Sequence, residues 1–342
     1  METPLHELFT SWGAEFGRLD GVELPLRVAG AGPEYEAARE GTALFDGGDR
    51  GWLEIEGEDA VDFLQRLLSS DVPALGDGGW QWSALLDGRG HWVADLILFR
   101  FGDRIEIDLP ASREDAVEQA LDRLHFGERL AWRRPRPARL LVAGPGAEAA
   151  VAGLGLPPAG EGPIQVLRRP DRGVECLELL GPPEEVAAHG ERLRAAGAVP
   201  AGLVALDILR VEAAEPRWGT DFNETVTLPE SNEWRRVSFT KGCYPGQEVV
   251  ARVNAYGEAP RQLCRLRFDG GTTPLAGCPL VDEEGKRLGR VSSWVWSPLR
   301  DEPIGLGTVR RRAAHNGARL LAAADDGARV GVTVEVPEKV HG

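Results

Sequence analysis

The sequence has few cysteines: four in 342 residues, at Cys176, Cys243, Cys264 and Cys278. They lie far apart and form no Cys-x-x-Cys or Cys/His pair, so neither a structural zinc site nor a self-contained iron–sulfur cluster is indicated. So few cysteines in so long a chain also argue against a disulfide framework. We therefore predict no stable metal.

Long apolar runs are absent as well. Residues 1–20 contain acidic and aromatic residues but no apolar core segment, so we see no signal peptide. No stretch approaches the ~20 apolar residues that a membrane span needs. We therefore expect a protein of the reducing cytoplasm, without a membrane partner.

Positive charge is scarce: 39 Lys and Arg face 54 Asp and Glu, for a net charge of -15. This balance argues against a general nucleic-acid or anionic-membrane surface, so we expect no direct nucleic-acid partner. The visible basic run comprises Arg133, Arg134, Arg136 and Arg139, interrupted by two prolines. We interpret this run as a solvated linker and a domain boundary.

The length exceeds what one hydrophobic core usually covers, which predicts two or three domains. In the first third, Glu36–Phe45 suggests a short helix ending near Gly41. Strand and helix patterns then alternate, and the order is typical of an α+β fold with an antiparallel sheet. Ser112 is expected to cap the last helix of this part. Strands are predicted at Trp52–Glu56, Trp82–Leu86, Trp92–Phe101 and Arg104–Leu109, the middle two forming a hairpin, and helices at Glu58–Leu68 and Arg113–Leu124.

After Arg139 the sequence predicts a smaller α+β layer, followed by a region of short strands. Strands are expected at Leu140–Gly144, Gln165–Arg168 and Cys176–Leu180, with helices at Ala147–Leu154, Pro183–Ala196 and Leu203–Val211. From Pro260 onward, short strands separated by turn residues predict a small antiparallel barrel. Those strands are Leu263–Phe268, Leu280–Val281, Gly289–Trp296, Ile304–Val309, Arg319–Ala322 and Arg329–Val336.

One stretch, Phe239–Glu248 (F-T-K-G-C-Y-P-G-Q-E), has the composition of a functional loop. Gly242 and Gly246 bracket a tight turn, and Gln247–Val253 leaves that turn as a short strand or helix.

Cys243 therefore lies on a turn beside Lys241. A nearby cation or a helix N-terminus can lower a cysteine pKa from ~8.5 to ~3.5–7.5, and the thiolate is the reactive form. Covalent catalysis, transient ligation of iron or sulfur, and redox exchange all stay open for this thiol. No His/Asp partner occurs at a recognisable spacing, so acyl transfer has little support. The alternative is a buried cysteine that follows a surface lysine.

The run F-x-K-G-C-Y-P-G-Q-E-V-V-A-R resembles the signature of the YgfZ-type folate-binding proteins, relatives of the T-protein (aminomethyltransferase) of the glycine cleavage system. The runs G-W-L-E-I-E-G-E-D-A and L-L-D-G-R-G-H resemble the N-terminal half of this family. The runs L-R-V-E, P-x-x-G-x-D and L-P-E resemble the stretch before its signature loop.

The resemblance implies an aminomethyltransferase-like fold of two α+β subdomains with a C-terminal antiparallel β-barrel. We divide it into a folate-binding region at 1–135, a second region carrying the loop at 136–260, and the barrel at 261–342.

By resemblance to the YgfZ-type proteins, the chain would bind tetrahydrofolate or a derivative. It would support assembly or repair of iron–sulfur clusters in client enzymes, including those that modify tRNA. Its partners would be those clients or other assembly proteins, and Cys243 and Lys241 would act catalytically.

The same resemblance assigns binding residues. Glu212 matches the pteridine-binding glutamate, and Trp52 matches a tryptophan that lines the folate site, whereas a second such tryptophan corresponds to Leu206. The alternatives are a capping or surface-paired glutamate and a core tryptophan. The remaining predicted binding residues belong to the loop and to the segment after it: Tyr244, Gln247, Glu248 and Arg252. For Lys241, Gln247 and Glu248 the alternative is turn stabilisation and solvent exposure, and Arg252 could instead pair with Glu248 across one helical turn.

A folate-dependent aminomethyltransferase is the alternative function. Such enzymes need a carboxylate near the reacting folate nitrogen, and in T-proteins an N-x-x-x-R-E-x-D motif ends on an aspartate. Here Arg113 and Glu114 match, but the Asn position is Leu109 and the Asp position is Ala116. Asp115 would point about 100° away around a helix. Enzymatic activity is therefore left open, as is a scaffold that binds no folate and uses the loop for docking.

Overall fold

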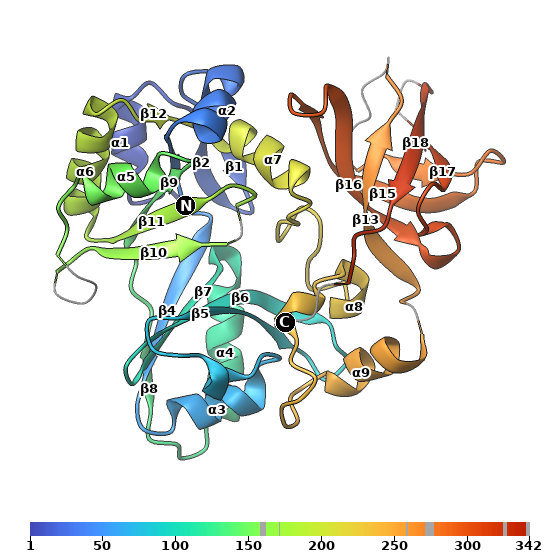
Figure 1. Ribbon diagram of the computed structural model, residues 1–342. Coiled ribbons are helices and arrows are strands. Elements are labelled where there is room, and N and C mark those ends of the chain that lie inside the picture. Colours follow the sequence, from blue (N-terminus) through green and yellow to red (C-terminus); the bar gives the residue numbers. More distant parts are fainter. Residues whose placement is uncertain (158–161, 171, 258, 271–276, 324–326, 340–342) are drawn as a thin grey trace. The chain divides into compact units, whose positions relative to one another are not determined.

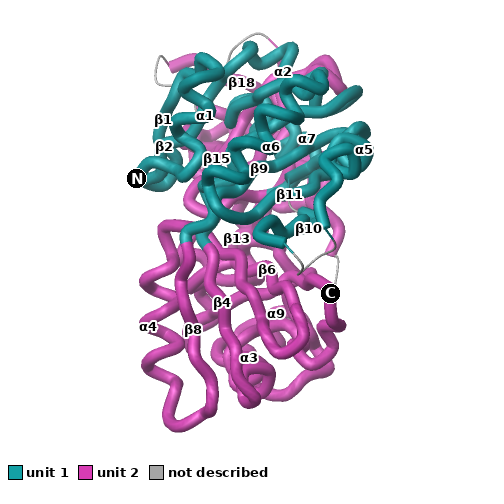
Figure 2. Tube along the Cα trace, turned by 90° about the vertical axis from the view of Figure 1, so that its left-hand side faces the viewer, with its two compact units in different colours: residues 1–51, 136–215 teal, residues 52–135, 216–342 magenta. Residues whose placement is uncertain are grey.

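The computed structural model describes residues 1–157, 162–170, 172–257, 259–270, 277–323 and 327–339, and Figure 1 gives the elements. The chain divides into two compact units, neither of them continuous in sequence (Figure 2). Unit 1 comprises Met1–Gly51 and Arg136–Glu215, and unit 2 comprises Trp52–Pro135 and Pro216–Gly342. The division at 1–135, 136–260 and 261–342 follows chain order and stays a prediction.

Unit 1 contains a five-stranded sheet in the order β10-β11-β9-β3-β12 and a two-stranded ribbon of β1 and β2. Only β12 of the sheet runs parallel to its neighbour; the other pairs are antiparallel. The strands are β1 (Glu15–Leu19), β2 (Val22–Arg27), β3 (Ala43–Asp46), β9 (Ala138–Ala143), β10 (Gln165–Arg169), β11 (Cys176–Gly181) and β12 (Val199–Pro200). The helices are α1 (His6–Ser11), α2 (Ala31–Glu40), α5 (Ala147–Ala152), α6 (Pro183–Ala195) and α7 (Leu203–Glu212). The helix expected at Glu36–Phe45 is thus the end of α2 followed by β3.

Helices cover both faces of this sheet, which explains why its central strand β9 is largely apolar. Successive side chains of a strand point to opposite faces. Leu140 and Val142 pack with residues of α1, α5 and α6, whereas Leu141 and Ala143 pack with residues of α2 and α7. Unit 1 is therefore a three-layer arrangement of helix, sheet and helix.

The expectation that Arg139 belongs to a solvated linker is wrong. Arg139 lies on β9 with 2% of its surface exposed. It forms two hydrogen bonds to the Glu178 carboxylate, at 2.7 and 2.9 Å, and Arg169 donates a third at 3.2 Å. Because a buried charge needs paired partners, this cluster places the arginine in the interior.

Unit 2 begins with a second five-stranded sheet, in the order β5-β6-β7-β4-β8. The elements are β4 (Arg50–Glu56), α3 (Ala60–Leu67), β5 (Trp80–Leu86), β6 (Trp92–Phe101), β7 (Arg104–Pro110), α4 (Glu114–Leu124) and β8 (Ala131–Arg133). The predicted β5–β6 hairpin and both helices are confirmed. The expected Ser112 cap is not: a 3-10 turn at Ala111–Arg113 leads into α4, and Arg113 stands at the N-cap without a side-chain cap.

The rest of unit 2 holds two helices and the barrel. Helices α8 (Leu228–Ser231) and α9 (Gln247–Tyr256) precede six antiparallel strands that close in the order β13-β16-β15-β14-β17-β18. These strands are β13 (Arg261–Phe268), β14 (Pro279–Val281), β15 (Arg287–Ser297), β16 (Glu302–Arg310), β17 (Arg319–Ala323) and β18 (Arg329–Glu335). The predicted α+β class with a C-terminal barrel is confirmed. In the described ranges no helix has the length and apolar character to cross a membrane.

Candidate functional site

The predicted signature loop leads directly into α9. Gly246 caps this helix in the left-handed region, with φ 79°. A Cβ atom at this position would lie 2.6 Å from the Asp87 carbonyl oxygen and 2.9 Å from Gly90 Cα. The backbone of the loop thus approaches the β5–β6 turn so closely that only glycine fits. Gly242 is different, because a Cβ there would meet nothing within 4 Å.

Lys241 anchors this loop to the C-terminal end of α3. Its Nζ donates hydrogen bonds to the backbone carbonyls of Gln65 at 2.5 Å, Leu68 at 2.5 Å and Ser70 at 2.9 Å. Carbonyls at the end of a helix lack partners within the helix, and an ammonium has three donors to offer them. Burial lowers the pKa of Lys241 to about 8, while Asp71 acts in the opposite direction. A catalytic role for Lys241 stays a prediction; the contacts give it a structural one.

Cys243 lies at the surface of this loop. Of the four cysteines, all within the described residues, Cys243 is exposed and the other three are buried. Burial raises the pKa of the Cys264 thiol to about 12. Cys243 is therefore the accessible thiol of the described chain.

The neighbouring loop residues differ in their surroundings. Tyr244 is 7% exposed and packs in an apolar cluster with Trp92 and Trp234, and burial raises its pKa to about 12. Gln247 is half-buried, whereas Glu248 and Arg252 on α9 are exposed. Within the described part of the chain no ion pair joins Glu248 to Arg252, so the pair considered from the sequence does not form.

Trp52 lies at the start of unit 2, on β4. It is 1% exposed, and its ring centroid is 5.6 Å from that of Phe99. Its backbone N–H donates to Glu114 Oε1 at 3.3 Å. The surroundings are those of a core tryptophan, and its role toward folate stays a prediction.

Glu212 is the last residue of α7 in unit 1 and is 7% exposed. Both carboxylate oxygens accept from the Tyr35 hydroxyl at 3.0 Å, and Arg39 forms an ion pair with Oε2. Burial and the hydrogen bond to Glu212 raise the pKa of Tyr35, against the effect of Arg39. Since Tyr35 and Arg39 lie one turn apart on α2, a single helix face orients this carboxylate.

The sequence interpretation missed a second buried carboxylate cluster, which lies in unit 2 around Arg236. Asp95, on β6, is 5% exposed and accepts from Arg236 Nη2 at 3.3 Å. Arg236 also donates to Glu233 at 2.8 Å, and its guanidinium lies 4.5 Å from the Trp82 ring centroid. Burial raises the pKa of Glu233, but the two adjacent arginines outweigh this effect and hold its pKa below the usual value. The one feature of the sequence that could have pointed to Asp95 is its position as an aspartate inside the largely apolar strand at Trp92–Phe101.

The carboxylate sought near the start of α4 is absent. Ala116 occupies its position, and the neighbouring Asp115 is exposed and pairs with Arg134 at 2.5 Å. Elsewhere in the described residues, Glu2, His6 and Glu23 bring potential metal-ligand atoms within 4.8 Å of one another. The expectation of no stable metal stays a prediction.

Comparison with known proteins identifies the family of this chain. Residues 5–156 match the GCVT N-terminal domain, and residues 261–340 match the glycine cleavage T-protein C-terminal barrel domain. The chain is 30% identical over 331 residues to an aminomethyltransferase of Frankia alni, covering 91% of this chain and 90% of that protein. It belongs to the glycine cleavage T-protein (aminomethyltransferase) family. An aminomethyltransferase of Synechococcus elongatus is 31% identical over 345 residues, covering 94% of this chain and 91% of that protein.

Solved structures agree with this T-protein family membership. The crystal structure of glycine cleavage system aminomethyltransferase T from Bartonella henselae matches with a TM-score of 0.92 and 27% identity, covering 99% of this chain and 98% of that one. The broader of the two resemblances is thereby confirmed. The relatives named here are aminomethyltransferases rather than YgfZ-type proteins.

Proposed function

We propose that this protein is a folate-dependent aminomethyltransferase of the T-protein type. It would bind tetrahydrofolate or a derivative and form methylenetetrahydrofolate from an aminomethyl-lipoyl carrier. The observation that carries the proposal is the near full-length match to aminomethyltransferases, over 91% of the chain in the Frankia alni comparison. The function expected as the alternative from the sequence thus becomes the leading one.

The residues around Glu212 fit a pteridine. A pteridine offers an exocyclic amine and a ring N–H, which a carboxylate can accept. Glu212 is buried and held by Tyr35 and Arg39. A carboxylate has about four lone-pair sites, more than one hydroxyl and one guanidinium use between them, so these two partners would orient Glu212 toward a ligand. Tetrahydrofolate, when bound, supplies the nitrogen that accepts the one-carbon unit.

Asp95 is our candidate for the carboxylate that the transfer requires. Ala116 removes the aspartate of the N-x-x-x-R-E-x-D motif, whereas Asp95 is a buried carboxylate that is hydrogen-bonded to Arg236. Asp95→Asn should abolish methylenetetrahydrofolate formation while preserving folate affinity. Asp115→Asn, an exposed aspartate, should leave both unchanged, and equal turnover by the two variants would refute the role of Asp95.

Calorimetric titration with tetrahydrofolate tests the binding step. Glu212→Gln keeps the shape but removes the charge, and it should weaken binding about tenfold or more, because hydrogen bonds to charged groups contribute about 1.5–3 kcal/mol. Glu191→Gln is the matched control, since Glu191 also accepts from an aromatic side chain of unit 1, at 2.8 Å from Trp12 Nε1. No folate signal for the wild type would instead favour a scaffold that uses the loop for docking.

Support of iron–sulfur cluster assembly or repair is the second candidate function, because Cys243 is exposed on a loop that resembles the YgfZ-type signature. Its partners would be client enzymes, including tRNA-modifying ones, or assembly proteins. In a strain lacking the chromosomal copy, Cys243→Ser should lower iron–sulfur enzyme activity, whereas the buried Cys176→Ser should not. Aminomethyl transfer, if it is the function, should survive Cys243→Ser.

A further inference from the structure

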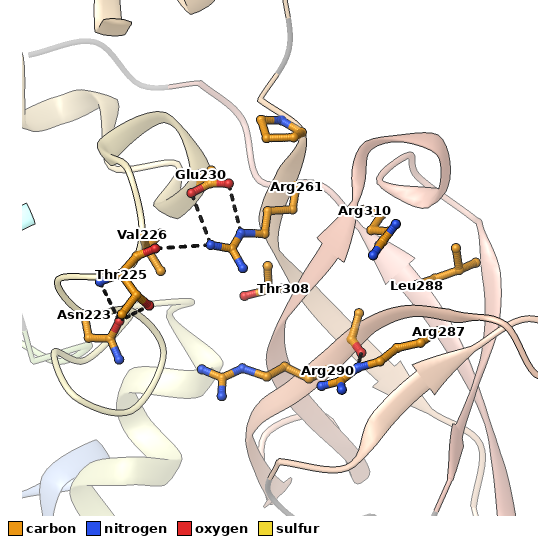
Figure 3. A pocket seen from close by; sticks show the side chains of 12 residues that line it. Asn223, Thr225, Val226, Glu230, Arg261, Arg287, Leu288, Arg290, Thr308 and Arg310 are labelled. Carbon is orange, nitrogen blue, oxygen red and sulfur yellow. Dashed lines mark hydrogen bonds and ion pairs between the residues drawn. The ribbon is translucent and has the colours of Figure 1, made fainter. Parts of the chain in front are cut away.

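A cavity of about 640 Å³ lies within unit 2, between residues 223–230 and the outside of the barrel. Its lining comes from that segment, from the start of β13, and from the paired strands β15 and β16. This volume falls in the range of about 300–1,000 Å³ typical of small-molecule sites. Figure 3 shows the arginines on the barrel strands and Asn223 and Thr225 on the segment opposite.

The lining is strongly cationic in a chain whose net charge is -15. Four arginines contribute, at positions 261, 287, 290 and 310, and the acidic lining residue is Glu230. Glu230 is already engaged, because Arg261 donates to its two oxygens at 2.9 and 3.5 Å. Four positive charges against one negative charge leave a formal excess of three around the cavity.

Two of these arginines have unused donors. Within the described part of the chain, the side chains of Arg290 and Arg310 have no hydrogen-bond or ion-pair partner. Strand register explains their position: Arg290 lies opposite Thr308, and Arg310 lies opposite Arg261. Their neighbours Val291 and Val309 are in the barrel core, so these arginines project outward.

The register also places two like charges face to face. Arg261 and Arg310 are directly opposite on paired strands, an arrangement that is destabilising on its own. Glu230 already pairs with Arg261, so an anion beside Arg310 would neutralise the remaining positive charge of this pair. The guanidinium fork matches carboxylate and phosphate oxygens in bidentate geometry, and Asn223, Thr225 and Thr308 add uncharged polar groups to the lining.

We propose that this cavity binds a small polyanion, a molecule carrying at least two phosphate or carboxylate groups. The lining includes none of the residues assigned above to folate or to the thiol, and the proposal does not depend on the proposed function. Several guanidinium groups around one cavity require a ligand with more than one anionic group, since a single anion would leave positive charge unmatched.

The test is calorimetric titration of the full chain at fixed ionic strength with two probes, sodium tripolyphosphate and sodium citrate. We expect saturable one-to-one binding of at least one probe, and the tighter probe identifies the site as phosphate-type or carboxylate-type. Arg290→Gln and Arg310→Gln should each weaken binding about tenfold or more. Arg329→Gln is the control, because Arg329 is an exposed barrel arginine outside the lining.

Thermal melting gives a second measurement. The better probe should raise the melting temperature of the wild type and of Arg329→Gln but not that of Arg310→Gln. Two results would overturn the proposal: no saturable binding of either probe, or an equal loss of affinity in Arg329→Gln and the cavity variants, which would indicate non-specific attraction.

Discussion

Gly246→Ala is a sharp perturbation of the loop that carries Cys243, because its cost arises from two independent features. The residue lies at φ 79°, and a side chain in the left-handed region costs roughly 1–2 kcal/mol. The added Cβ would lie 2.6 Å from the Asp87 carbonyl oxygen and 2.9 Å from Gly90 Cα. Both are backbone atoms that cannot rotate away, and such overpacking typically costs about 1–3 kcal/mol. We expect a loss of about 2–5 kcal/mol in the free energy of unfolding.

Urea unfolding of Gly246→Ala against Gly242→Ala measures this effect. Gly242 lies in the same loop but has open space around its Cβ position and lacks a positive φ, so its substitution should change stability by less than about 0.5 kcal/mol. The alkylation rate of Cys243 reports locally, and we expect it to change in Gly246→Ala alone. Equal stability of the two variants would refute the reasoning, because it would mean that the approach to the β5–β6 turn is not maintained in solution.

Three further predictions concern buried or half-buried charges. Lys241→Met should lower the free energy of unfolding by about 1–3 kcal/mol and speed amide hydrogen exchange in residues 239–246, since three carbonyls lose their donor, whereas the exposed Lys286→Met should do neither. Burial raises the pKa of Asp46 from 3.8 to about 6, so the folded chain binds more protons between those values and stability falls as pH rises through them. Asp46→Asn should flatten this fall and gain up to about 3 kcal/mol at pH 7 in urea unfolding, and an unchanged pH profile would contradict the assignment. Arg139→Met should cost about 3–5 kcal/mol because it leaves part of a buried carboxylate unpaired, and the exposed Arg136→Met, measured in parallel, should cost little.

Local patterns in the sequence predict the elements of this fold well, whereas pairings between distant segments escape them. The barrel strands and the β5–β6 hairpin are predicted by alternation and turn residues, which act over a few positions. Local patterns could not predict which segments make up unit 1, because its strand β3 at Ala43–Asp46 pairs with the distant strand β9 at Ala138–Ala143. Arg139 illustrates the consequence: it comes after prolines and other arginines, as a linker residue would, and its partner Glu178 becomes visible only when β11 is placed beside β9.

The candidate site shows the same limit. A glycine-rich turn predicts an exposed Cys243, and the structure places it at the surface. The partners of Lys241 lie 171 to 176 residues earlier in the chain, so no local pattern could reveal them. Asp95 was missed because an aspartate in an apolar strand gives no motif, and its arginine partner is 141 residues away.

The closeness of Lys241 to Cys243 in the sequence is therefore not by itself evidence that the lysine charge acts on the thiol. The Lys241 ammonium is engaged by three backbone carbonyls and so holds the loop that presents Cys243, while a direct role toward the thiol stays a prediction. The two candidate functions then rest on different residues: folate binding on Glu212 in unit 1, and thiol chemistry on Cys243 in unit 2. Because the two residues belong to different compact units, Glu212→Gln and Cys243→Ser should affect folate binding and iron–sulfur enzyme activity independently if both functions exist. If Glu212→Gln lowers both folate binding and iron–sulfur enzyme activity, the function of the thiol requires bound folate.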